Sequence, residues 1–313
     1  MNLDIIICTY NRAFLLDACL TSVIAQIRKM SREMSCEMPD VHLWVVDNNS
    51  SDNTAALVAR YTTEYPDIVR YVFEPAQGLS QARNRGITAS SAPWLAFLDD
   101  EAILESGWLA SGLDVINSGD FDCFGGVFLA HYPFPGKPDW LAEDFGTNQT
   151  LQNHYGPLPP DKTPAGGNMF CRRGALLEAG GFPVNLGMGA GGKKVAYGEE
   201  TFMCRQMRKN GGRIGFVPDL IIHHSVVPEK YRMGWHFRSE YTRGRDDLII
   251  HDLPASKGKA IALLLSLPLI MLRDSIRGGQ RLWQAGRLNA QSLYFFVVSR
   301  AARRIGRSVG HLR

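Results

Sequence analysis

Residues 94–101 read WLAFLDDE, an apolar run that ends in three acids, Asp99, Asp100 and Glu101. A buried strand that ends in acids puts negative charge at its carboxyl end, which is where open α/β sheets bind their ligands. Divalent ions such as Mg²⁺ and Mn²⁺ prefer carboxylate oxygens and often take further ligands from substrate phosphates. The stretch therefore indicates a metal-dependent enzyme whose leaving group is a phosphate. The alternative is a solvated acidic loop, or a helix start stabilised by the helix dipole.

Strand-like and helix-like segments alternate around this stretch. The apolar runs that predict strands lie at residues 3–8, 41–46, 68–73 and 94–98, and the segments with helical spacing lie at 16–27, 57–65 and 80–89. Continuous apolar runs suit parallel strands that are covered on both faces. The order predicts an open α/β sheet. A glycine-rich dinucleotide fingerprint does not follow the first strand, which argues against a nicotinamide or flavin enzyme.

Composition narrows the class of protein and its compartment. The 313 residues are 45% hydrophobic and 21% charged, which suits one large or two modest globular domains. The six cysteines lack Cys-x-x-Cys spacing, so they signal neither a zinc site nor a disulfide framework, and a reducing compartment fits best. The N-terminus enters an apolar run without a basic region, unlike a secretory signal. We therefore expect a cytoplasmic catalytic region.

The C-terminal segment differs from the rest in charge. Residues 256–313 hold eleven Lys and Arg and one acid, Asp274, so they carry +10 and leave −7 for the other residues of a chain whose net charge is +3. Its apolar stretch at 260–272 contains Pro268 and is shorter than the roughly 20 residues of a membrane span. Basic amphipathic segments bind the anionic cytoplasmic leaflet. We expect this segment on the inner membrane surface, or else packed on the catalytic domain. Few aromatic stacking residues and no binding module argue against nucleic acid as a partner.

Several short motifs follow one another over most of the chain. They are ICTYNR at 7–12, VVDNNSSDNT at 45–54, GLSQARNRG at 78–86, FLDDE at 97–101, GGNMFCRR at 166–173, GGF at 180–182, GEET at 198–201 and HSVVPEK at 224–230. Together they resemble the motifs of glycosyltransferase family 2. The resemblance implies a GT-A fold, which is an open, Rossmann-like mixed sheet flanked by helices. It also implies a nucleotide-activated sugar donor, a divalent metal and inversion at the anomeric carbon.

The resemblance assigns donor contacts to residues near the ends of the strands. They are Thr9, Tyr10, Arg12, Asp47, Arg83, Asn84, Asp99 and Asp100. Tyr10 offers a stacking face, and the carboxylate of Asp47 can accept hydrogen bonds from the base or the ribose. The guanidinium of Arg83 suits a nucleotide by its charge and fork geometry. The alternatives are that Arg83 pairs with an acid and that Asp47 caps the following helix.

The resemblance also implies a metal site. In the family's Asp-x-Asp motif the first acid, here Asp99, approaches the ribose and the last, here Glu101, binds the metal. Glutamate departs from that pattern but keeps an oxygen ligand on a longer arm, and Asp100 is the ligand if Glu101 cannot reach. His224 matches a further metal contact, with His223 as its rival. Mn²⁺ or Mg²⁺ held by Asp99, Glu101 and His224 would neutralise charge on the leaving diphosphate.

The expected base lies in the motif at 198–201. Inversion in one displacement needs a carboxylate that takes the proton of the acceptor hydroxyl. Glu200 matches the second acid of the family's pair, and Glu199 is its rival. Both fall in the first turn of a predicted helix, where the helix dipole favours the ionised form. An ordinary capping pair is the alternative.

These expectations combine into one account. Residues 1–250 are expected to form the GT-A domain and residues 251–313 a basic, amphipathic helical extension on the inner face of the cell membrane. The activity would be inverting transfer of a sugar, from a UDP-sugar by preference, to a glycan or lipid-linked acceptor in polysaccharide assembly. One alternative is a catalytically degenerate scaffold that binds glycan or nucleotide sugar. Another is a sugar-phosphate nucleotidyltransferase, which normally shows a glycine-rich basic N-terminal loop.

Overall fold

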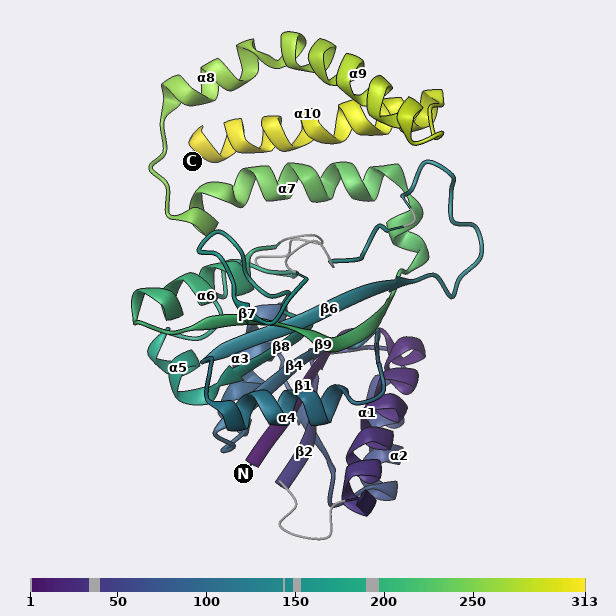
Figure 1. The fold of residues 1–313 in the computed structure, drawn as a ribbon, viewed down its shortest axis with the longest axis vertical. Coiled ribbons are helices and arrows are strands. Elements are labelled where there is room, and N and C mark those ends of the chain that lie inside the picture. The colour runs from purple at the N-terminus through teal and green to yellow at the C-terminus, as the bar shows by residue number, and fades with distance from the viewer. Residues whose placement is uncertain (1, 34–39, 143, 149–152, 190–196, 313) are drawn as a thin grey trace.

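A mixed sheet forms the centre of the molecule (Figure 1). The computed structural model describes residues 2–33, 40–142, 144–148, 153–189 and 197–312. The strands are β1 (Asn2–Thr9), β2 (Asp40–Asp47), β3 (Val69–Phe73), β4 (Trp94–Asp99), β5 (Ala102–Leu104), β6 (Cys123–His131), β7 (Gly156–Pro157), β8 (Asn168–Arg172) and β9 (Ile214–Ser225). Their order is β3-β2-β1-β4-β8-β6-β9-β5, with β7 paired to β9. The first four strands are parallel and β8 is antiparallel to β4, so the sheet is mixed.

The described residues form ten α-helices, of which the first six cover the two faces of the sheet. They are α1 (Ala13–Glu33), α2 (Thr54–Glu64), α3 (Leu79–Ala89), α4 (Trp108–Ser118), α5 (Arg173–Glu178), α6 (Glu199–Lys209), α7 (Met233–His251), α8 (Lys257–Leu265), α9 (Leu267–Gln284) and α10 (Ala290–Leu312), with the short 3-10 helix η2 at Pro228–Tyr231. The predicted alternation of strands and helices through residue 99 is confirmed. The strands alternate with helices because their side chains are apolar on both faces, so helices must cover the sheet on both sides.

The core has two layers because side chains alternate along a strand. Ile5 and Ile7 of β1 pack with residues of α1, α2 and α4, whereas Ile6 packs with residues of α3, α5 and α6. All three side chains are completely buried. Each such burial contributes about 1.5–3 kcal/mol to folding. The two apolar layers therefore hold β1 rigidly in the middle of the sheet.

Three parallel strands end together at one edge. Thr9 of β1 is in register with Asp47 of β2, and Cys8 of β1 with Asp99 of β4. We call the ends of β1, β2 and β4, at Thr9, Asp47 and Asp99, the carboxyl edge. The sequence predicts acids at the ends of two of these strands, and the register brings them to one place.

Helices α7–α10, residues 233–312, form a second layered structure above the sheet, here called the helical unit (Figure 1). Within it, α10 packs on α7, and α8 and α9 lie on the far side of α10. The crossing of α7 and α10 is so close that a Cβ on Gly306 would lie 1.9 Å from the carbonyl oxygen of Tyr241. None of the helices in the described part of the chain is long and apolar enough to cross a bilayer.

The helical unit includes α7, which begins well before the predicted boundary between residues 250 and 251 and ends at it. That boundary stays a prediction. Pro268 falls in the first turn of α9, a position that tolerates proline because the missing N–H would have no helical partner. The apolar stretch 260–272 is thus divided between α8 and α9.

Candidate active site

A buried charge network lies beside the carboxyl edge. The hydroxyl of Thr9 donates to Oδ2 of Asp100 at 2.8 Å, and Nη1 of Arg12 contacts Oδ1 of Asp100 at 3.1 Å. The same Nη1 donates to Oε2 of Glu101 at 2.8 Å. Asp100 and Glu101 are only 5% and 4% exposed. The acids after β4 are therefore held in a network, which is not the solvated loop of the alternative interpretation.

Glu101, His224 and Lys230 form a nearly equilateral triangle. Nζ of Lys230 lies 2.9 Å from Oε1 of Glu101 and 3.0 Å from Nε2 of His224, and these two acceptor atoms are 3.1 Å apart. Burial alone would raise the pKa of Glu101, but the charges of Lys230 and Arg12 lower it. Burial and the charge of Lys230 lower the pKa of His224, which favours the neutral imidazole. Because an ammonium has only donors, Nε2 of His224 accepts from it.

Asp99 and Asp100 have different surroundings. Burial raises the pKa of Asp100 to about 6, against the opposing charge of Arg12. Asp99 is the more open acid, since its side chain is 33% exposed and its nearest cation is Nη2 of Arg83 at 3.8 Å. On one side this carboxylate packs against the backbone of Gly167, where a Cβ would lie only 2.1 Å from it, so a side chain at position 167 would displace Asp99. Asp99 is thus the acid at the carboxyl edge that is open to a ligand.

The predicted metal ligands are brought together only in part. His224 and Glu101 are in contact, whereas His223 turns to Glu105, with Nε2 2.6 Å from Oε2 of that acid. In the described ranges no three His, Cys, Asp or Glu side chains lie close enough to hold an ion among themselves. The metal role of Asp99 stays a prediction, as do those of Glu101 and His224.

The donor side of the carboxyl edge contains Asp47 and Tyr10. Asp47 is 1% exposed, and its carboxylate accepts from the backbone N of Ser50 at 2.9 Å and from the hydroxyl of Tyr71 at 3.0 Å. It therefore fixes the loop after β2 and does not cap α2, which begins at Thr54. The ring of Tyr10 is exposed at the end of β1. Nucleotide contacts by Thr9, Tyr10 and Asp47 stay predictions.

Helix α3 carries two of the predicted donor residues. Nη1 of Arg83 lies 2.8 Å from Oε1 of Glu199, and both side chains are buried. Asn84 donates to the carbonyl oxygen of Phe182 at 2.8 Å and accepts from its backbone N at 2.9 Å. The alternative for Arg83, pairing with an acid, is thus present in the structure. Nucleotide contacts by Arg12, Arg83, Asn84, Asp99 and Asp100 stay predictions.

Glu199 and Glu200 begin α6 but have different environments. Glu199 is buried against Arg83, whereas Glu200 is partly exposed. Burial and the neighbouring Glu199 raise the pKa of Glu200 to about 8. Desolvation and the charge of Glu199 thus oppose the helix-dipole effect expected to favour an ionised Glu200, and its role as the base stays a prediction. A carboxylate with such a pKa is a stronger base than an ordinary glutamate, but it is ionised, and able to accept a proton, chiefly above about pH 8.

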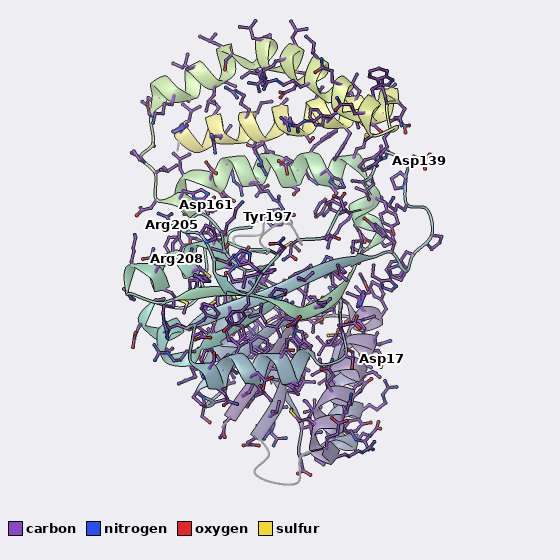
Figure 2. All side chains as sticks on the ribbon, viewed as in Figure 1. Asp17, Asp139, Asp161, Tyr197, Arg205 and Arg208 are labelled. Atoms are coloured by element: carbon purple, nitrogen blue, oxygen red, sulfur yellow. The ribbon has the colours of Figure 1, made fainter. Side chains whose placement is uncertain are left out.

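The start of α6 rests on the helical unit. The hydroxyl of Tyr197 accepts from Ser239 of α7 at 3.0 Å, and the guanidinium of Arg243 lies 4.4 Å from the centre of the Tyr197 ring. Nη1 of Arg205 donates to the carbonyl oxygen of Ile250 at 2.6 Å. Figure 2 shows Tyr197 and Arg205 on the side of the sheet that faces α7. The turn that bears Glu199 and Glu200 is thus supported from above by α7 and from below by Arg83.

Known proteins with similar sequences decide the family. The sequence model described as "Glycosyl transferase family 2" matches residues 4–179, more than half of the chain. The chain belongs to this family. "Glycosyltransferase AglE" of Haloferax volcanii is 30% identical over 225 residues, which is 72% of this chain and 67% of the relative. "Succinoglycan biosynthesis protein ExoM" of Rhizobium meliloti is 28% identical over 251 residues, which is 78% of this chain and 75% of the relative.

A solved structure agrees with the family in fold. The mannosyltransferase PcManGT from Pyrobaculum calidifontis, in complex with GDP-Man and Mn²⁺, superposes with a TM-score of 0.56 at 20% identity. The match covers 77% of this chain and 61% of the other. The predicted GT-A fold with a helical C-terminal segment is confirmed, and so is the prediction of a glycosyltransferase. Membership of family 2 sets aside the nucleotidyltransferase alternative.

Lys230 contacts two of the predicted metal ligands, Glu101 and His224, although no role was predicted for it from the sequence. It lies on η2, six residues after His224, so neither helical nor strand periodicity points to it. The only signal is its place at the end of the motif at 224–230.

Proposed function

We propose that the chain is an inverting glycosyltransferase that acts in polysaccharide or glycoconjugate biosynthesis. The donor is a nucleoside-diphosphate sugar, with UDP-sugars favoured, and the acceptor is a glycan or a lipid-linked sugar. One observation carries the proposal. The guanidinium of Arg83 lies between the open acid Asp99 and the start of α6, where Glu200 has a raised pKa. Donor-side and acceptor-side acids are thus connected through one buried cation.

The proposed reaction is a single displacement. An acceptor hydroxyl attacks the anomeric carbon from the face opposite the diphosphate, and the carbon–oxygen bond to the diphosphate breaks as the new bond forms. The hydroxyl proton passes to the carboxylate of Glu200, and the products are the nucleoside diphosphate and a glycoside of inverted configuration. Glu199 is the weaker candidate for the base because it is buried in its pair with Arg83.

The metal proposed for this site can be tested against its residues. The 3.1 Å between Oε1 of Glu101 and Nε2 of His224 matches two neighbouring ligands of an octahedral ion, which stand about 3.0 Å apart when each bond is about 2.1 Å. Mg²⁺ and Mn²⁺ need few protein ligands because water and substrate phosphate supply the rest. Glu101 and His224 therefore fit such an ion. When bound, it would stabilise the charge that develops on the diphosphate.

The outer face of α9 supports a position on the cytoplasmic membrane surface. Leu269, Leu272, Ile276 and Trp283 are all more than half exposed. Their spacings of three, four and seven residues place them on one side of the helix. We call these four residues the apolar stripe. An exposed apolar row of this length on a monomer is typical of an interaction surface.

Charge supports an anionic membrane as the partner of the apolar stripe. Arg273, Arg277 and Arg281 are exposed on the same helix. The acid on this helix, Asp274, is buried and pairs with Arg273 at 3.0 Å. Exposed arginines beside an apolar stripe complement anionic lipid headgroups above an acyl layer. A lipid-linked acceptor would be presented to the enzyme at such a surface.

A transfer reaction tests the proposal. UDP-sugars and GDP-mannose are each incubated with the protein, Mn²⁺ and octyl glycosides as acceptors, and the products are followed by NMR. We expect one donor to give a glycoside whose new linkage has the opposite anomeric configuration. Retained configuration would contradict the single displacement. Failure of every donor to bind would favour the catalytically degenerate scaffold instead.

A further inference from the structure

Lys230 occupies the place that a metal ion would need. Its ammonium lies 2.9 Å from Oε1 of Glu101 and 3.0 Å from Nε2 of His224, the two atoms that fit the ion proposed above. Its side chain is 15% exposed, so the ammonium is largely shielded from water. The chain thus carries a cation of its own at this point.

The segment that bears Lys230 is fixed, but its side chain is long. The backbone N of Lys230 donates to the carbonyl oxygen of Val227 at 2.9 Å, and its carbonyl oxygen lies 2.7 Å from Nε2 of His236. These contacts hold η2 in position. The four-carbon side chain has rotatable bonds through which the ammonium can leave Glu101 without any movement of η2.

The charges around Glu101 are already balanced. Arg12 and Lys230 carry two positive charges and contact Glu101 and Asp100, which supply two acids. A divalent ion added here would bring two further positive charges within about 3 Å of an ammonium, which is strongly unfavourable even when screened. The ion can enter favourably only if negative charge enters too and the ammonium moves away. The diphosphate of a donor supplies that charge.

We propose that Lys230 holds the metal position in the donor-free protein, so that a divalent ion enters together with the donor's diphosphate and not before it. The inference rests on the proposed function. It makes Lys230 a positioning residue whose ammonium leaves Glu101 and His224 to the ion and turns to the diphosphate. Binding of metal and donor is then coupled, and the coupling is reciprocal.

A titration with Mn²⁺ in the absence of donor tests the inference. Bound and free Mn²⁺ are distinguished by electron paramagnetic resonance for the wild-type protein, Lys230→Met and Lys230→Arg. Removal of the ammonium should tighten Mn²⁺ binding by at least about tenfold in Lys230→Met, because the repulsion is gone. Lys230→Arg keeps the charge and should bind as weakly as the wild type. Lys29→Met, at an exposed lysine of α1, is the control that should change nothing.

Two further measurements locate the ion and test the coupling. In Lys230→Met, a second substitution, His224→Ala, should abolish the gained affinity, because it removes one of the two proposed ligands. UDP should tighten Mn²⁺ binding to the wild type at least about tenfold more than it tightens binding to Lys230→Met. Thermal unfolding of each variant checks that it is folded.

Equal Mn²⁺ affinity of the wild type and Lys230→Met would overturn the inference. So would a gain in affinity that survives His224→Ala, since the ion would then bind elsewhere. Because the Mn²⁺ titration uses neither donor nor turnover, its result is independent of the transfer assay. A protein that transfers no sugar refutes the proposed function, whereas a wild type that transfers sugar but binds Mn²⁺ tightly alone refutes only the role of Lys230.

Discussion

The carboxyl edge of the sheet and the outer face of α9 use charged and apolar groups in opposite ways. At the edge most charges are buried and held by partners from other parts of the chain, as Arg83 of α3 is by Glu199 of α6, and Asp99 is the open exception. On α9 the apolar side chains are exposed, and arginines stand beside them in contact with solvent.

This contrast predicts how each region responds to amino-acid substitution. Removing the partner of a buried charge leaves that charge without either water or a counter-charge, so single substitutions at buried pairs of the edge are costly. A surface that binds through a row of separate side chains loses only a share of its free energy with each one. We therefore expect single substitutions at the carboxyl edge to have large effects. On α9 the binding free energy should be the sum of small contributions from several side chains.

The largest expected effect is on turnover, at Glu200. Glu200→Gln keeps the size of the side chain but removes the proton acceptor, so kcat should fall by about 10² to 10⁴-fold. Donor affinity, measured by calorimetry, should stay the same because the base contacts the acceptor. Glu33→Gln, at an exposed acid of α1, is the matched control. Full turnover by Glu200→Gln would remove this residue from the mechanism.

The next effect is on folding, at the pair between Arg83 and Glu199. Arg83→Met leaves Glu199 buried without its cation and should lower the free energy of unfolding by about 3–5 kcal/mol. The matched control is Arg60→Met, which removes an exposed pair with Asp17 and should cost under about 1 kcal/mol. Denaturation followed by circular dichroism measures both. Losses of equal size would contradict the contrast between buried and exposed charges.

The pH profile follows from the raised pKa of Glu200. A base with a pKa of about 8 is protonated at lower pH, so kcat/KM should fall about tenfold for each pH unit below 8. At pH 6 it should be about a hundredfold below its plateau. A rate that stays constant between pH 6 and pH 9 would show that Glu200 is not the titrating base.

The pH dependence of protein stability is a second test of the raised pKa of Glu200. Between its ordinary value of 4.5 and about 8, Glu200 holds a proton in the folded state that it has lost in the unfolded state. Its contribution to stability is therefore full below pH 4.5 and is lost as the pH rises through 8. Glu200→Gln, which is always neutral, should gain in unfolding temperature over the wild type as the pH rises from 5 to 9. A constant difference would contradict the raised pKa.

The smallest effect for one substitution is expected on α9. Leu269→Asp or Leu272→Asp should each weaken binding to vesicles that contain anionic lipid by about tenfold, and the double variant by more. Turnover with a water-soluble acceptor should not change. Leu177→Asp, at an exposed leucine of α5, is the control. Binding that is equally strong to neutral vesicles, or untouched by the double variant, would argue against a membrane surface.

The sequence predicts the first half of the fold because it is coded locally. The continuous apolar runs and the helical spacings each lie within one element, so the strands up to Asp99 follow from them. The site is coded only in part. The acids at the ends of β2 and β4 can be located from the sequence, but the partners of those acids come from distant elements. Glu199 is 116 residues from Arg83, and Lys230 is 129 residues from Glu101.

In the helical unit, too, the contacts between distant elements cannot be predicted from the sequence. The unit's basic and apolar composition is evident from the sequence and predicts an amphipathic helical extension. Which side of α9 is exposed depends on its packing against α10, where Gly278 meets the ring of Phe296. The sequence does not reveal that α9 packs against α10, so it does not reveal which side of α9 is exposed.

The central claim is that a nucleotide sugar binds at the carboxyl edge. Calorimetric titration of a panel of nucleotide sugars in the presence of Mn²⁺ tests it most directly, with the wild type, Asp99→Asn and the control Asp139→Asn, an exposed acid near the helical unit (Figure 2). At least one donor should bind the wild type and Asp139→Asn alike, and Asp99→Asn should bind it about tenfold more weakly or worse. Donor binding that Asp99→Asn leaves unchanged, or a wild type that binds no donor, would contradict the claim.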